Sequence, residues 1–119
     1  MLRNRIAPLM LIVIWPVAGF SSERQKIETT ELIVREASAR VAAALKDPES
    51  ARFSDWKAYR NSNGTVDVCG KVNAKNSFGG YSGAAWFVVP ESLDVQIYNN
   101  SARGFTASNA IVETLCELK

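Results

Sequence analysis

The sequence predicts an α+β domain in which a long N-terminal helix packs on a four-stranded antiparallel meander. A short C-terminal helix completes the domain and is tied to the sheet by a disulfide. Apolar residues recur at helical spacing over residues 22–45, strand-like segments with turn signals fill residues 53–98, and helical spacing returns near the C-terminus. The order helix, four strands, helix is typical of domains whose helices cover one antiparallel sheet.

The first 19 residues have the pattern of a secretory signal peptide. Arg3 and Arg5 precede a short apolar stretch with two prolines, and the small residues Val17, Ala18 and Gly19 form a cleavage site. A membrane-spanning helix needs roughly 20 apolar residues, so a permanent anchor is the less favoured alternative. We expect a leader over residues 1–19, export to the periplasm or the medium, and a single compact domain over residues 20–119.

The charge balance argues against nucleic acid as a partner. The whole chain has 14 basic and 12 acidic side chains, so removing Arg3 and Arg5 with the leader leaves equal numbers of each. Clustered Lys and Arg supply most of the affinity for phosphate backbones and for anionic lipid, and a neutral domain lacks that excess. We therefore expect neither nucleic-acid binding nor strong electrostatic attachment to a membrane.

The two cysteines, Cys69 and Cys116, predict a disulfide. An even number of cysteines in an exported domain reads as a bridge, with two buried free thiols as the alternative. The chain has no histidine, and two isolated cysteines make a poor ligand set, so we expect no metal site.

The first helix is predicted from spacing and from its end signals. Ser22 and Gln25 resemble a capping box, and Pro48 stops the helix and begins a single turn that Asp47 caps. The apolar positions recur on one face, at Ile27, Val34, Ala37, Val41, Ala44 and Leu45.

The dipeptide Asn63-Gly64 is the strongest hairpin signal, because both residues tolerate positive φ. It predicts strands at about residues 53–61 and 65–72. A two-residue loop sets the register, with Arg60 opposite Asp67, Tyr59 opposite Val68, Ala58 opposite Cys69, and Trp56 opposite Lys71. Apolar residues then fall on both faces of the second strand, so either both faces are covered or a bulge at Gly70 resets the alternation.

The last three elements follow from the remaining apolar patterns. Residues 84–89 are apolar on both alternating sets, which predicts a central strand buried on both sides and ended by Pro90. A half-buried strand carries Leu93, Val95 and Ile97. A final helix is capped near Ser108 and buries Ile111, Val112, Leu115 and Cys116.

Two segments resemble the paired signature of a family of small, uncharacterised, exported bacterial proteins. Residues 45–53 read LKDPESARF, which is similar to the family's KDP-x-SA-x-F corner. Residues 68–81 read VCGKVNAKNSFGGY, which is similar to its CG-x-VN-x-KN-x-x-GGY stretch. The resemblance implies a bacterial origin and an envelope location, and it brings no known activity or catalytic residue.

The sequence offers no catalytic set. Without histidine there is no His base, and both cysteines are expected to be oxidised. Carboxylates remain as acid–base candidates, but capping, turns and a cross-strand ion pair explain most of them. The glycines of residues 79–83 lack the lysine and hydroxyl of a phosphate-binding loop. We expect no catalytic residues and no cofactor.

The candidate binding site is the loop of residues 73–83, which combines amides, a cation and two aromatic rings between two strands. Its candidate residues are Asn73, Lys75, Asn76, Phe78 and Tyr81. The alternative is a structural loop, in which the asparagines satisfy turn backbone and Phe78 and Tyr81 fold back over the sheet edge.

Two functions remain. The first is an exported, non-catalytic binding protein, such as an inhibitor or an accessory subunit of an envelope system, that presents this loop to a protein or cell-envelope partner. The second is a small carboxylate-using enzyme or ligand carrier with a cleft between helix and sheet. A deep cavity holding two carboxylates of divergent pKa favours the second function, and a flat or ridge-like loop favours the first.

Overall fold

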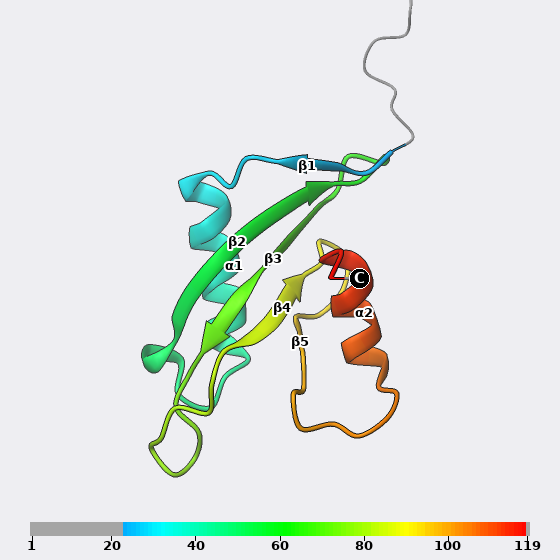
Figure 1. The fold of residues 1–119 in the computed structure, drawn as a ribbon. Helices are drawn as coiled ribbons and strands as arrows, with labels where there is room; N and C mark the ends of the chain where they lie inside the picture. The colour runs from blue at the N-terminus through cyan, green and yellow to red at the C-terminus, as the bar shows by residue number, and fades with distance from the viewer. Residues whose placement is uncertain (1–22, 119) are drawn as a thin grey trace, which may run out of the picture.

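A computed structural model describes residues 23–118, so the predicted leader and its cleavage site lie outside the described residues (Figure 1). Residues 23–118 form one antiparallel sheet of five strands in the order β1-β2-β3-β4-β5, with two α-helices. The elements are β1 (Gln25–Ile27), α1 (Glu31–Ala43), the 3-10 turn η1 (Pro48–Ser50), β2 (Arg52–Arg60), β3 (Val66–Asn73), β4 (Ala85–Val89), β5 (Gln96–Ile97) and α2 (Ala107–Leu115).

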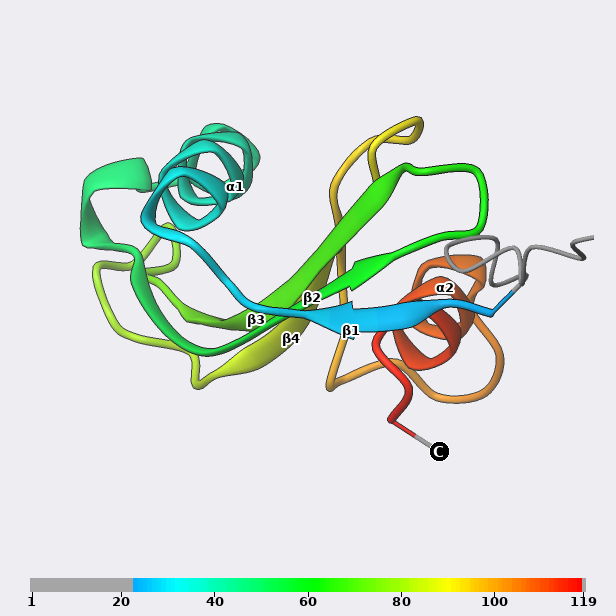
Figure 2. The same cartoon turned by 90° about the horizontal axis from the view of Figure 1, so that it is seen from above.

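The two helices lie on opposite sides of the sheet (Figure 2). Successive residues of a strand point to opposite faces, so each face has its own core. The core under α1 contains Ala37, Val41, Val68, Val72, Phe87 and Val89. The core under α2 contains Tyr59, Cys69, Val88, Val112 and Cys116. The α+β class and the antiparallel sheet are confirmed, and both faces of β3 are covered.

The long N-terminal helix is wrong, and so is the count of four strands. The helix covers only the 13 residues of α1, and residues Gln25–Ile27 form an additional edge strand that pairs with β2. Thr30 is the N-cap, because its Oγ1 accepts a hydrogen bond of 3.3 Å from the backbone N of Ile33. The predicted capping box therefore does not form: Gln25 lies in β1, and Ser22 is outside the part that the structure describes.

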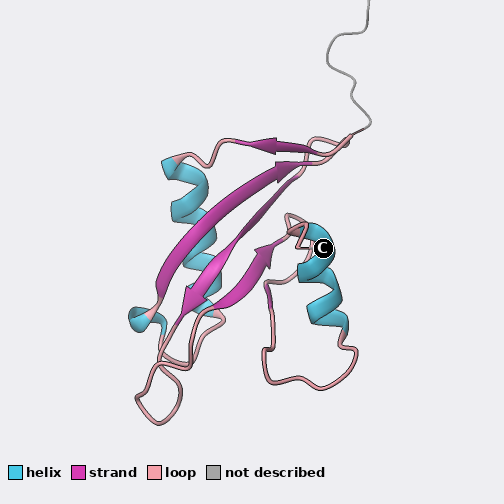
Figure 3. Cartoon of the chain, viewed as in Figure 1, coloured by secondary structure: helices cyan, strands magenta, loops and turns pink. Residues whose placement is uncertain are grey.

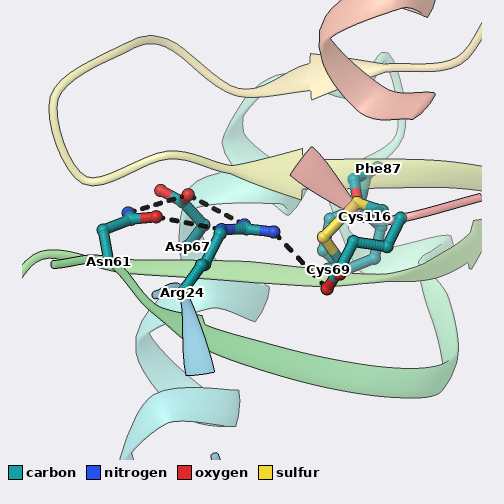
Figure 4. Close-up of a disulfide and its surroundings, with 7 residues drawn as sticks. Arg24, Asn61, Asp67, Cys69, Phe87 and Cys116 are labelled. Carbon is teal, nitrogen blue, oxygen red and sulfur yellow. Dashed lines mark hydrogen bonds and ion pairs between the residues drawn. A yellow bond between two sulfur atoms is a disulfide. The ribbon is translucent and has the colours of Figure 1, made fainter. Parts of the chain in front are cut away.

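Arg24 holds β1 in place through contacts distant in sequence. Its Nη2 lies 3.0 Å from Asp67 Oδ2, and its Nε donates to Asn61 Oδ1 at 2.9 Å (Figure 4). Its guanidinium also lies 4.3 Å from the centre of the Tyr59 ring. Asp67 is only 5% exposed, so this pair neutralises a carboxylate that burial would otherwise disfavour. Burial and the nearby Glu117 carboxylate raise the pKa of Tyr59 above its usual value.

The Asn63-Gly64 turn is confirmed, but the predicted register is wrong by one residue. Asn61 N donates to Thr65 O at 2.8 Å, and Gly64 has a φ of 88°, which makes a three-residue loop with glycine in the left-handed region. The observed pairs place Arg60 opposite Val66, Tyr59 opposite Asp67 and Ala58 opposite Val68. Asp67 therefore meets Arg24 rather than Arg60.

The register of β2 against β3 shifts once along the pair, opposite Gly70. The irregularity lies in β2, between Ser54 and Lys57, where Asp55 has a φ of 53°. A Cβ atom added at Gly70 would lie 2.7 Å from the Phe87 ring and 3.2 Å from Ser54 O. The bulge is therefore in the partner strand, and Gly70 itself leaves room for the Phe87 ring.

The C-terminal part differs from its prediction in detail. The β5 strand has only two residues, and Leu93 is 53% exposed rather than half-buried in a strand. The cap of α2 is Thr106, whose Oγ1 accepts from Asn109 N at 3.1 Å, instead of Ser108. Val112 and Cys116 are fully buried, and the predicted disulfide between Cys69 and Cys116 is present (Figure 4).

Gly70→Ala is expected to lower the free energy of unfolding by about 1–3 kcal/mol, because the new methyl group overpacks the Phe87 ring. Gly80→Ala is the matched control, since a Cβ atom there meets nothing within 4 Å. Denaturant unfolding measures both variants. Equal stability of the two would contradict the close approach at Gly70.

The double variant Cys69→Ala, Cys116→Ala is expected to lose about 4 kcal/mol of stability, because the bridge closes a loop with a sequence separation of 47 residues. Reductant should destabilise the wild type in denaturant unfolding and leave the double variant unchanged. A wild type insensitive to reductant would show that the bridge contributes no stability.

Candidate functional site

The β3–β4 connection, residues 73–83, forms a short hairpin extension that we call the hairpin tip. Lys75 and Tyr81 make an antiparallel bridge outside the named strands, so strand-like pairing continues past the end of β3. Figure 3 shows the hairpin tip projecting beyond the sheet, beside η1. The candidate binding loop is therefore a ridge with its own hydrogen bonds.

The two asparagines of the predicted site hold the shape of the hairpin tip. The side-chain oxygen of Asn76 accepts from the backbone N of Phe78 at 2.9 Å and of Gly80 at 3.2 Å. The side-chain oxygen of Asn73 accepts from Gly83 N at 3.1 Å. Both oxygens satisfy turn backbone, which is the structural role that asparagine commonly has in turns.

Ser50 joins the hairpin tip to the η1 corner. Its Oγ accepts from Lys75 N at 2.8 Å and donates to Asp47 O at 2.8 Å, and its backbone O accepts from the Tyr81 hydroxyl at 3.1 Å. The predicted single turn after Pro48 is confirmed, but the Asp47 side chain makes no capping hydrogen bond. Ser50 therefore fixes both strands of the hairpin tip against the corner.

Two cations surround the Tyr81 ring. The Arg52 guanidinium lies 4.2 Å from the ring centre, and Lys75 Nζ lies 5.9 Å from it. Arg52 reaches this position because it begins β2 opposite Asn73. The hairpin tip contains no Asp or Glu, so its only charge is that of Lys75, and Arg52 adds a second positive charge.

Sequence reasoning missed Ser50 and Arg52 as site residues. Both lie in residues 45–53, and their partners Lys75 and Tyr81 lie in residues 68–81, so the two family-like segments contact each other. The resemblance was the available signal for Ser50 and Arg52, because two segments that are distant in sequence but belong to one family signature are expected to contact each other in the fold.

Phe78 and Tyr81 differ sharply in exposure. Tyr81 is 37% exposed and folds back, as the structural alternative expected, but onto the η1 corner instead of the sheet edge. Phe78 is 97% exposed at the turn of the hairpin tip, so it does not cover the sheet edge. The structural alternative thus accounts for Tyr81 and both asparagines but leaves Phe78 without a role in the fold.

A groove with a volume of about 310 Å³ runs between α1 and the strands β3 and β4, and reaches the β2–β3 turn at Gly64; we call it the α1 groove. Its floor is apolar, and carboxylates stand at its sides. The lining includes Ile33, Val66, Val68 and Val89 on the floor and Glu36 and Glu91 at the sides. This is the cleft between helix and sheet that the second function requires.

Two of the polar groups at the α1 groove serve the fold. Glu91 Oε2 accepts a hydrogen bond from Val66 N at 2.5 Å. Arg40 donates to Pro90 O at 3.3 Å and to Leu93 O at 3.1 Å. Glu36 is the third charged group of the groove and lies on the exposed side of α1.

Trp56 and Trp86 lie in different surroundings on opposite faces of the sheet. The Trp56 ring packs 5.4 Å from Phe53 and 5.5 Å from Phe87, which makes it a core residue. Trp86 lies on the other face, with Lys57 Nζ 4.8 Å and Lys71 Nζ 5.0 Å from its ring centre, and lines a smaller hollow of about 210 Å³.

Within residues 23–118, no three His, Cys, Asp or Glu side chains gather closely enough to hold a metal ion. No helix in this same range is long and apolar enough to cross a membrane. Comparison of the chain with family models, with curated proteins and with solved structures gave no match.

Ser50→Ala is expected to cost about 1 kcal/mol of stability and to speed amide hydrogen exchange at Lys75, because the Lys75 backbone N loses its acceptor. Ser77→Ala, in the same hairpin tip, is the control and should change neither the stability nor the exchange rate at Lys75. Protection at Lys75 that survives in Ser50→Ala would contradict the role of Ser50.

Proposed function

We propose that the protein is an exported, non-catalytic binding protein that presents the hairpin tip to a protein partner in the cell envelope. Its role is that of an inhibitor or an accessory subunit. The observation that carries the proposal is the 97% exposure of Phe78 on a ridge whose backbone is hydrogen-bonded internally. The Phe78 side chain in this position contributes nothing to the core.

The hairpin tip has the properties of a preformed recognition element. Aromatic residues and Arg dominate many protein interfaces. Phe78 lies in the same hairpin tip as Lys75 and Tyr81, and Arg52 lies against the Tyr81 ring. The Asn76 and Ser50 hydrogen bonds fix the backbone before binding. A preordered loop loses less conformational entropy on association, which favours affinity.

Export is supported by two independent features. The N-terminal residues have the pattern of a signal peptide, and the disulfide between Cys69 and Cys116 is of a kind that persists in oxidising compartments. Both features fit a periplasmic or secreted protein, in agreement with the envelope location implied by the family resemblance.

The second candidate function is a ligand carrier or a small enzyme that uses the α1 groove. The presence of Glu36 and Glu91 beside an apolar floor favours it. We rank it second because Glu91 is engaged by backbone and no nucleophile or base accompanies Glu36 in the groove lining.

Phe78→Ala is expected to weaken partner capture about 30-fold, the loss typical of a buried aromatic anchor worth about 2 kcal/mol. The test immobilises the oxidised protein and measures retention of binding proteins from an envelope fraction of the bacterium that encodes it. The control is Phe105→Ala, because Phe105 is also an exposed phenylalanine, at 86%, but lies outside the hairpin tip.

Equal capture by Phe78→Ala and Phe105→Ala would overturn the assignment of the hairpin tip as the binding site. Loss of capture in Glu36→Gln, with Phe78→Ala unaffected, would favour the α1 groove and the second function instead.

A further inference from the structure

We propose that the partner of the hairpin tip is a second copy of this chain, whose α1 groove receives Phe78. The proposal rests on the binding function proposed above and names its partner. One chain thus carries both the exposed aromatic side chain of Phe78 and the α1 groove. The groove offers Phe78 an apolar environment, and the Phe78 side chain would fill the groove.

The α1 groove has the size and lining for an aromatic side chain. Its volume of about 310 Å³ is near the lower end for ligand pockets, so a single ring and its flanking backbone suit it better than a large ligand. Val68 and Val89 belong to the buried core and give the groove a firm apolar floor, while Ile33 and Val66 are partly exposed along it. Insertion of Phe78 would remove apolar surface from water on both molecules.

The charges of the two surfaces are complementary. The hairpin tip presents Lys75 and has Arg52 beside it, with no acidic residue of its own. The groove carries the carboxylates of Glu36 and Glu91, and its one cation, Arg40, donates to backbone carbonyls of the following turn. A positive ridge against a negative recess favours encounter and disfavours groove-to-groove or tip-to-tip contacts.

The two surfaces lie at opposite ends of β3. Val66 begins β3 two residues after Gly64, which lines the groove, and Asn73 ends β3 at the hairpin tip. The two ends of the strand are about 23 Å apart at the usual rise per residue. A molecule therefore cannot fill its own groove, and the contact forms between two molecules.

A contact between tip and groove can assemble in two ways. If each tip enters the groove of the other molecule, association stops at a two-fold dimer. If only one tip and one groove are joined, each molecule keeps an unused tip or groove, and association continues into a ring or an open chain.

The test is complementation between two variants, measured by sedimentation velocity on the oxidised protein over a wide concentration range. Phe78→Ala removes the anchor and keeps the groove. Glu36→Lys reverses a charge at the groove, on the exposed side of α1, and keeps the tip. The controls Phe105→Ala and Glu28→Lys make the same kinds of change at exposed positions outside both surfaces.

Wild type and both controls are expected to form dimers or larger species as concentration rises. Phe78→Ala and Glu36→Lys should each associate at least about 30-fold more weakly. Their equimolar mixture should form a one-to-one pair and nothing larger, because only one intact tip and one intact groove remain. Added salt should weaken that pair by screening its charges.

A wild type that stays monomeric would overturn the inference, yet Phe78→Ala would still lose capture of another envelope protein if the proposed function is right. Wild-type oligomers that Phe78→Ala leaves intact would also overturn it, by locating self-association elsewhere. Loss of the function itself would show as equal capture by Phe78→Ala and Phe105→Ala.

Discussion

Burial of β3 on both faces is the constraint on which the rest of the structure depends. Val68 faces the core under α1, and the next residue, Cys69, faces the core under α2 and is bonded to Cys116. A strand covered on both sides cannot slip by one residue without exchanging its two cores. The fixed register of β3 therefore fixes the position of everything attached to its ends, including the hairpin tip.

The same constraint explains the irregular features around β3. Gly70 gives the Phe87 ring its space, and the residue that disturbs the ladder is displaced into β2, where Asp55 adopts a positive φ. At the start of β3, buried Asp67 requires a cation, and Arg24 supplies it from the segment that continues into β1. An edge strand, a bulge and an ion pair are thus consequences of one central strand.

Local patterns predicted the elements that local chemistry determines. The disulfide, the turn at Gly64 and the buried strand β4 all follow from residue types and spacing. The β1 strand did not, because Arg24 and Asp67 are 43 residues apart and three strand residues carry little signal. The register failed for a related reason: the same Asn-Gly pair fits a two-residue or a three-residue loop, and packing across the sheet decides between them.

The candidate site likewise has a part that the sequence predicts and a part that only tertiary contacts determine. The five predicted residues do lie in one hairpin, but a sequence cannot say which of them fold back and which remain free. Tertiary contacts from the η1 corner decide that: Ser50 takes the Tyr81 hydroxyl and the Lys75 amide, and Arg52 covers the Tyr81 ring. With its neighbours committed to the fold, Phe78 is left exposed on a fixed support. A single anchor of this kind depends on a receptor whose shape fits it, and the positive charges of Lys75 and Arg52 near the Tyr81 ring add to the attraction of that receptor.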